Sequence, residues 1–150
     1  MKTIIISPYS KVMRNGQRNP KNYPYWEELV RLLHEKGYHT IQVGVAGEEP
    51  IGAKEIHIGL PLRKLEGMIK KCDIWISVDN FFHHLADLIG KQGFVLFGQS
   101  DPVIFGHESN INILKDREYL RALQFAPWEE SKHQEDAFLK AEDVMKVIDG

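Results

Sequence analysis

Short apolar runs alternate along this chain with segments of helical periodicity, and this alternation limits the folds open to it. The runs occupy residues 4–6, 40–44, 55–58, 73–78, 93–98 and 111–114. Between them, apolar residues recur every three or four positions, as at Leu62, Leu65, Met68 and Ile69. Strands joined by helices through right-handed crossovers form a parallel sheet. The sequence therefore predicts an α/β fold: one Rossmann-like domain over residues 1–150, with about six parallel strands and helices on both faces.

Composition and charge exclude several classes of protein. Hydrophobic residues make up 43% of the 150 residues and charged residues 27%, which is typical of a folded globular domain. The net charge of -2 provides no field that would attract nucleic acid or an anionic membrane. The apolar run from Thr3 to Ile6 is too short for a signal peptide or a membrane span. The single cysteine, Cys72, has no disulfide partner, so we expect a cytoplasmic protein.

Ligands of such sheets bind beyond the carboxyl ends of the strands, where the strand order reverses. The loops that follow Ile6, Gly44, Val78 and Phe97 should therefore share one edge of the sheet. These loops supply four candidate ligand-binding residues, Ser7, Tyr9, Gly44 and Gln99.

The segment CDIWISVDNFFHHLA, residues 72–86, joins a strand to a helix. Asp79 or Asn80 can cap that helix, whose first N–H groups would then favour a phosphate. Phe81, His83 and His84 are further candidates in this turn. The alternative is that Asp79 is only a cap and that the two phenylalanines belong to the core. Adjacent histidines lack the spacing of metal ligands on a helix, so we expect no metal and no cofactor.

A basic loop follows the first strand and contains no acidic residue. Lys11, Arg14, Arg18 and Lys21 lie in it, and together they could hold a pyrophosphate; the alternative is a solvated loop. After the second strand, Glu48 or Glu49 can accept hydrogen bonds from ribose hydroxyls, although exposed glutamates are more often solvated. The chain has neither a Walker loop nor a GxGxxG or GxSxG motif, so it is not an ordinary P-loop protein, dehydrogenase or hydrolase.

Five pieces, in this order and spacing, resemble the C-terminal half of the family 9 glycosyltransferases, the lipopolysaccharide heptosyltransferases of GT-B architecture. They are Ser7-Pro8, NPKNYPYW at residues 19–26, residues 62–69, residues 72–86 and FGQSDP at residues 97–102.

The resemblance implies a site for a nucleotide-sugar donor such as ADP-heptose. It places Lys21 on a donor phosphate and the turn 79–84 against the diphosphate and sugar. The family pattern in this turn is Asp, Ser or Thr, Gly, two variable positions, His, Leu and Ala. This chain keeps Asp79 and residues 84–86 but has Asn80 and Phe81 in place of the small pair. Phe81 brings a bulky ring where glycine would allow close approach to phosphate.

The family places its acceptor site and catalytic base in an N-terminal domain that this chain does not contain. We therefore expect a donor-binding glycosyltransferase domain that works with a separate acceptor-domain partner or as a homo-oligomer. The first alternative is a non-catalytic protein that sequesters or senses an ADP-sugar or an ADP-ribose-like nucleotide. The second is an association domain whose interface uses Phe81, Phe82 and Trp128.

Overall fold

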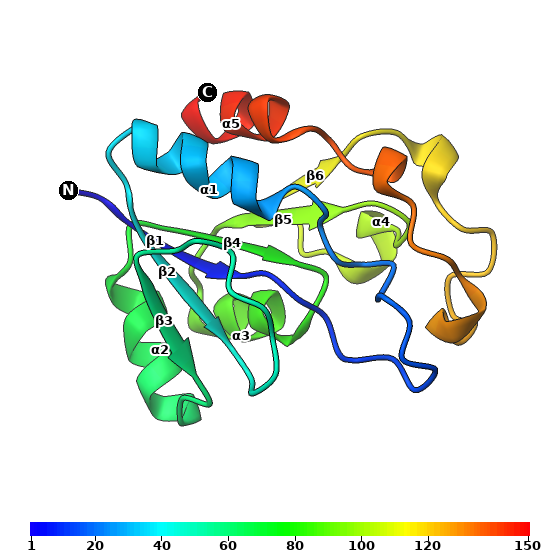
Figure 1. The fold of residues 1–150 in the computed structure, drawn as a ribbon, viewed down its shortest axis with the longest axis horizontal. Coiled ribbons are helices and arrows are strands. Elements are labelled where there is room, and N and C mark those ends of the chain that lie inside the picture. The colour runs from blue at the N-terminus through cyan, green and yellow to red at the C-terminus, as the bar shows by residue number, and fades with distance from the viewer.

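The centre of the structure is a sheet of six strands that all run parallel (Figure 1). A computed structural model describes all 150 residues. The strands are β1 (Thr3–Ser7), β2 (His39–Gly44), β3 (Glu55–Ile58), β4 (Ile74–Val78), β5 (Phe94–Phe97) and β6 (Ile111–Leu114). Their order is β3-β2-β1-β4-β5-β6, so the strand order reverses between β1 and β4. The predicted α/β, Rossmann-like arrangement is confirmed.

Alternate residues of the central strand β1 supply the two cores. Ile4 and Ile6 face a core formed with α1 (Trp26–Glu35) and α5 (Ala141–Asp149). Ile5 faces the opposite core, formed with α2 (Leu62–Lys71) and α3 (Phe81–Ile89). All three isoleucines are buried, and each contributes about 1.5–3 kcal/mol through removal from water. This two-sided burial explains why the run is continuously apolar rather than alternating.

The connection from β2 to β3 contains no helix. Buried side chains of β2 hold this loop instead: the Gln42 amide donates to Glu49 O at 2.9 Å and accepts from Ile51 N at 3.0 Å. The Thr40 hydroxyl accepts from Lys54 N at 3.0 Å. These bonds satisfy loop backbone groups that a helix would otherwise pair internally.

The C-terminal segment, residues 115–140, runs past the carboxyl ends of the strands before it reaches α5 (Figure 1). It contains three single turns of 3₁₀ helix: η1 (Arg117–Tyr119), η2 (Trp128–Glu130) and η3 (Glu135–Ala137). A four-residue helix, α4 (Pro102–Phe105), precedes β6. The sequence favours full exposure of residues 129–136, whereas Glu129, Ser131 and His133 are half-buried against the rest of the domain. None of the helices has the length and apolar character that crossing a bilayer requires.

Candidate functional site

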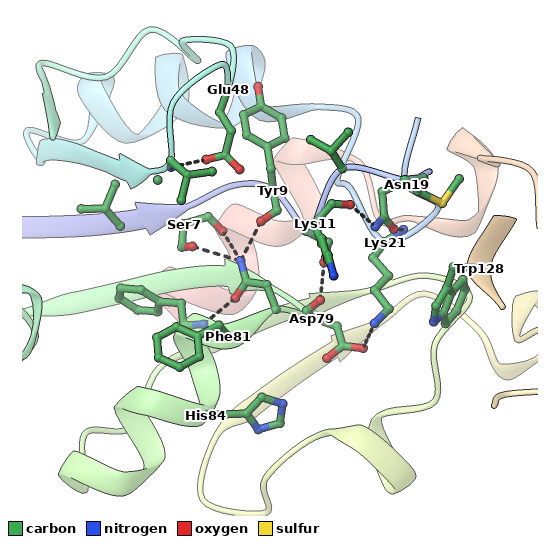
Figure 2. Close-up of a pocket in the computed structure, with 18 of the residues that line it drawn as sticks. Ser7, Tyr9, Lys11, Asn19, Lys21, Glu48, Asp79, Phe81, His84 and Trp128 are labelled. Atoms are coloured by element: carbon green, nitrogen blue, oxygen red, sulfur yellow. Dashed lines mark hydrogen bonds and ion pairs between the residues drawn. The ribbon is translucent and has the colours of Figure 1, made fainter. Parts of the chain in front are cut away.

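A cavity of about 1010 Å³ opens at the carboxyl edge of the sheet, at the point where the strand order reverses. Its walls come from the loops after β1, β2, β3 and β4, from α2 and α4, and from the C-terminal segment, and Figure 2 shows part of this lining. Ligands of doubly wound sheets bind at this position because the two neighbouring loops diverge there.

The first turn of α3 forms one wall of the cavity, and Asn80 determines its position. The Asn80 side chain caps the helix by accepting from Phe82 N at 2.9 Å. Its amide nitrogen donates to Ser7 Oγ at 3.0 Å and to Tyr9 O at 3.1 Å. Ser10 Oγ also donates to Asp79 O. The loops after β1 and β4 are therefore joined directly.

One amide group at the start of α3 remains free beside the cavity. The N–H group of Phe81, a residue that lines the cavity, has no partner within the protein, because the Asn80 cap takes only the N–H of Phe82. An unpaired N–H group and the positive end of the helix dipole favour an anion at this wall.

The long loop after β1 is held by side-chain amides rather than by secondary structure. Asn19 donates to Lys11 O at 2.8 Å and accepts from Lys21 N at 2.9 Å. Asn22 accepts from Ser10 N at 2.8 Å, and the indole of Trp26 donates to Pro8 O at 3.0 Å. This network fixes Lys21 at the cavity wall and explains the order of a loop that lacks helix or strand.

A largely buried group of polar side chains lies at the wall of the cavity and consists of Asp79, Lys21 and His83. Lys21 Nζ lies 3.3 Å from Asp79 Oδ2, and His83 Nε2 lies 3.0 Å from Asp79 Oδ1. Burial raises the pKa of Asp79, but the bond from His83 and the charge of Lys21 outweigh it and leave the pKa below its ordinary value. Asp79 is therefore ionised, and its charge is balanced by Lys21.

Lys21 also lies against aromatic rings. Its Nζ is 5.0 Å from the ring centre of Trp128 and 5.8 Å from that of Phe105. The face of an aromatic ring attracts a cation. The ammonium therefore has a fixed position between the Asp79 carboxylate and the two rings, as Figure 2 shows for Asp79 and Trp128.

The other basic residues of this loop differ in their partners. Arg14 forms an ion pair of 3.4 Å with Glu129, and Arg18 one of 3.5 Å with Glu135. Lys11 lines the cavity without an ion pair. The C-terminal segment thus supplies acidic residues to a loop that has none of its own, and this part of the positive cluster is neutralised.

The turn after β2 closes the cavity from the opposite side. Glu48 Oε1 accepts from Val45 N at 3.0 Å, which folds the carboxylate over Gly44. A Cβ atom at Gly44 would lie 2.0 Å from that oxygen, so the position leaves room for the carboxylate only as glycine. Burial raises the pKa of Glu48. The carboxylate lies where a hydroxyl-bearing ligand could donate to it.

Most of the predicted residues lie around this one cavity. Those that line it are Ser7, Tyr9, Lys11, Lys21, Gly44, Glu48, Asp79, Asn80, Phe81 and His84. Arg18, His83 and Gln99 do not line it. Arg18 turns to Glu135, His83 is fully buried beneath Asp79, and Gln99 donates to Lys132 O at 2.8 Å and so holds the C-terminal segment.

Trp128, Phe105 and Met13 also line the cavity, and the sequence did not indicate this role for any of them. For Trp128 the sequence suggests only a place in an interface. A tryptophan in an otherwise polar segment is the one signal that could have pointed to it, because an indole is seldom left in water without a partner. Its neighbour in the site, Lys21, lies more than a hundred residues earlier in the chain.

The cavity combines an apolar part with localised polar groups. Lys21 and the free N–H group of Phe81 can bind a phosphate-like anion, the Glu48 carboxylate can accept hydroxyl donors, and the exposed ring of Phe81 offers a flat apolar surface. This set suits a ligand with anionic, hydroxylated and planar parts.

No family model and no curated protein matches the sequence. Solved structures do match its fold. The ADP-heptose lipopolysaccharide heptosyltransferase II of E. coli superposes with a TM-score of 0.73 at 17% identity, over 99% of this chain and 45% of its own. The chain folds like part of a heptosyltransferase.

Two further structures give the same result. The heptosyltransferase WaaC of E. coli, solved with ADP, has a TM-score of 0.68 at 17% identity, over 99% of this chain and 43% of its own. A family 9 glycosyltransferase of Veillonella parvula has a TM-score of 0.72 at 18% identity, over 97% and 44%. The chain thus spans less than half the length of these proteins, and the family 9 fold expected from the sequence is confirmed.

Proposed function

We propose that the cavity binds an ADP-containing nucleotide sugar and that the chain acts as the donor-binding part of a glycosyltransferase system. The observation that carries this proposal is that Lys21 and the N-terminus of α3, with the free N–H group of Phe81, line the same cavity at the reversal of strand order. A diphosphate there would gain charge-assisted hydrogen bonds from both sources.

Similar folds support the choice of nucleotide. One matching heptosyltransferase was solved with ADP and a related structure with ADP-2-deoxy-2-fluoro heptose. For this chain the adenosine would occupy the side of the cavity near Glu48, and the sugar the side near Phe81 and His84. Transfer also requires an acceptor site and a base, which we propose that a partner domain or a second copy supplies.

A binding protein without transfer activity is the second candidate. Asp79 Oδ1 pairs with His83 and its Oδ2 lies beside Lys21, so this carboxylate is not available to take a proton from an acceptor hydroxyl and cannot supply the base if the chain acts alone. Such a protein would sequester or sense an ADP-sugar or ADP-ribose-like nucleotide.

Calorimetric titration with ADP, UDP, an ADP-sugar and ADP-ribose tests the proposal. We expect binding of the ADP compounds and weaker binding of UDP. Release of ADP from the ADP-sugar would support transfer chemistry, whereas tight binding without release would support the second candidate. No binding of any ADP compound would overturn both.

Lys21→Ala should weaken ADP binding by about 1–3 kcal/mol, as expected for the loss of a charge-assisted phosphate contact. Lys36→Ala is the matched control, because Lys36 lies at the C-terminal end of α1, does not line the cavity and pairs with Asp149 instead. Thermal melting of both variants shows whether they remain folded. An unchanged dissociation constant in folded Lys21→Ala would remove this lysine from the site.

A further inference from the structure

Three imidazole rings gather beside the cavity although the sequence separates one of them from the others. His83 and His84 lie in the first turn of α3, and His107 lies in the loop between α4 and β6. One ring nitrogen of each histidine lies within 4.8 Å of those of the other two. The ring centres of His83 and His84 are 4.0 Å apart, and those of His84 and His107 are 4.9 Å apart.

His83 has a buried nitrogen without a partner. The residue is fully buried, and its Nε2 lies 3.0 Å from Asp79 Oδ1. An ionised carboxylate can only accept, so Nε2 carries the proton and the neutral ring has its lone pair on Nδ1. No group in the protein bonds to Nδ1. A buried polar atom of this kind indicates a missing ligand or a bound ion.

His107 has the environment of a metal-binding histidine. Its Nδ1 lies 3.3 Å from Asp87 Oδ2, while Ser109 Oγ donates to the other carboxylate oxygen at 3.1 Å. Its Nε2 is directed at His84 Nδ1, 2.8 Å away. A carboxylate behind the ring fixes the tautomer that leaves Nε2 free to bind a metal, as Asp79 does for His83.

A simple hydrogen bond between His84 and His107 explains only part of this arrangement. It pairs one nitrogen of His84 with one of His107 but leaves Nδ1 of His83 unsatisfied. It also does not account for the carboxylates that lie behind the rings of His83 and His107. A cation between the three rings accounts for all of these contacts, because moving the His84 proton from Nδ1 to Nε2 makes three lone pairs available without changing the net charge.

We propose that His83, His84 and His107 bind one divalent transition metal ion of the zinc class, with Asp79 and Asp87 orienting the first and third of these ligands. Imidazole nitrogens are the usual protein ligands for such ions, and three of them leave a fourth position open. Because His84 is exposed and lines the cavity, the proposed site borders the cavity.

Burial lowers the pKa of His84, which favours the neutral imidazole that a metal ligand must present. The adjacent pair is a poor metal motif by itself. The site arises only because the loop before β6 brings His107 against the first turn of α3, which no local spacing in the sequence reveals.

Titration of the untagged, chelator-treated full chain with Zn²⁺ tests the proposal. We expect one equivalent to bind by calorimetry, and Co²⁺ in its place to give the intense visible absorption of a four-coordinate site. His107→Gln and His84→Gln should abolish both signals. His57→Gln is the matched control: His57 also lines the cavity and pairs with a carboxylate, but it lies outside the cluster, so the variant should bind as the parent does.

Asp87→Asn gives a graded result. It leaves all three ligands in place and should weaken Zn²⁺ binding by about 10- to 100-fold, the usual effect of removing a carboxylate behind a ligand histidine. Absence of stoichiometric binding, or binding that persists in both His107→Gln and His84→Gln, would overturn the proposal. No nucleotide is present in these titrations, so their result is separate from that of the proposed function.

Discussion

At the start of α3, Asn80 forms a set of hydrogen bonds that a serine or threonine hydroxyl could not form. The Asn80 side chain accepts from Phe82 N while its amide donates to Ser7 and to the backbone of Tyr9. Serine or threonine has a single hydroxyl hydrogen to donate, whereas an amide has two. The sequence predicted a cap by Asp79 or Asn80, and the cap is Asn80, which frees the Asp79 carboxylate to pair with Lys21.

Phe81, next to this cap, should contribute to ligand binding rather than to stability. Its side chain is 63% exposed and lines the cavity. Phe81→Ala should weaken binding of an ADP-sugar by about 0.5–1.5 kcal/mol, the range for contact with a planar or apolar surface. Leu88→Ala is the control, since Leu88 lies on the same helix, is 86% exposed and does not line the cavity.

Calorimetric affinities and melting temperatures of the two variants check this prediction. Equal affinities for parent and Phe81→Ala would mean that the ring only borders the cavity. Tighter binding by Phe81→Ala would mean that the ring obstructs the position that glycine leaves open in the family.

Among the elements, the strands were the most predictable and the connections the least. The runs at 4–6 and 73–78 became β1 and β4 almost unchanged, because burial on both faces requires continuous apolar sequence. The loop from Val45 to Lys54 has no periodicity to indicate that Gln42 and Thr40 would bond to it. These hydrogen bonds depend on which residues of the loop lie opposite Thr40 and Gln42 in the folded domain, and the periodicity of the sequence does not indicate this.

A contrast in packing between two glycines gives a prediction at this scale. A Cβ at Gly98, after β5, would lie 2.6 Å from the ring of Phe138, which is almost fully buried in the core next to α5. A Cβ at Gly67, in α2, would have no neighbouring atom within 4 Å. We expect Gly98→Ala to lower the free energy of unfolding by about 1–3 kcal/mol through overpacking.

Gly67→Ala should instead raise the free energy of unfolding by about 0.5–1 kcal/mol, because alanine loses less backbone entropy in a helix. Urea denaturation of parent and both variants measures the two effects together. The same sign of change in both variants would contradict the packing described for Gly98.

For the whole molecule, three histidines make stability depend on pH. Burial lowers the pKa values of His34, His84 and His133 below the ordinary 6.5. The unfolded chain then binds protons more readily than the folded one as the pH falls below about 6.5. The stabilisation from these groups is therefore complete above that pH and declines below it, and the free energy of unfolding should fall between about pH 7.5 and about pH 5.5.

Burial raises the pKa of Glu48, so this group makes the free energy of unfolding rise, not fall, as the pH decreases. A variant is therefore needed to isolate the contribution of the histidines. In the parent protein, His133 Nε2 lies 2.7 Å from Asn22 O. The side-chain amide of His133→Gln can donate the same hydrogen bond but does not titrate. Urea denaturation at both pH values should show a smaller pH dependence in this variant. An identical dependence in parent and variant would show that the burial of His133 does not contribute.

The sequence predicted the edge of the sheet at which the site lies, but it did not predict which segment closes the cavity. Strand order placed the loops after β1, β2 and β4 together, and ten of the predicted residues line the cavity. Its remaining wall, with Trp128, comes from a segment whose course the sequence did not indicate. Contacts between residues as distant as 14 and 129 are set by the folded domain and not by neighbours along the chain.

That wall sets an order of events during synthesis. Synthesis completes β1, β2, β4 and α3 well before it reaches Trp128. The elements that carry the binding loops therefore exist in the nascent chain before the side of the cavity that Trp128 forms.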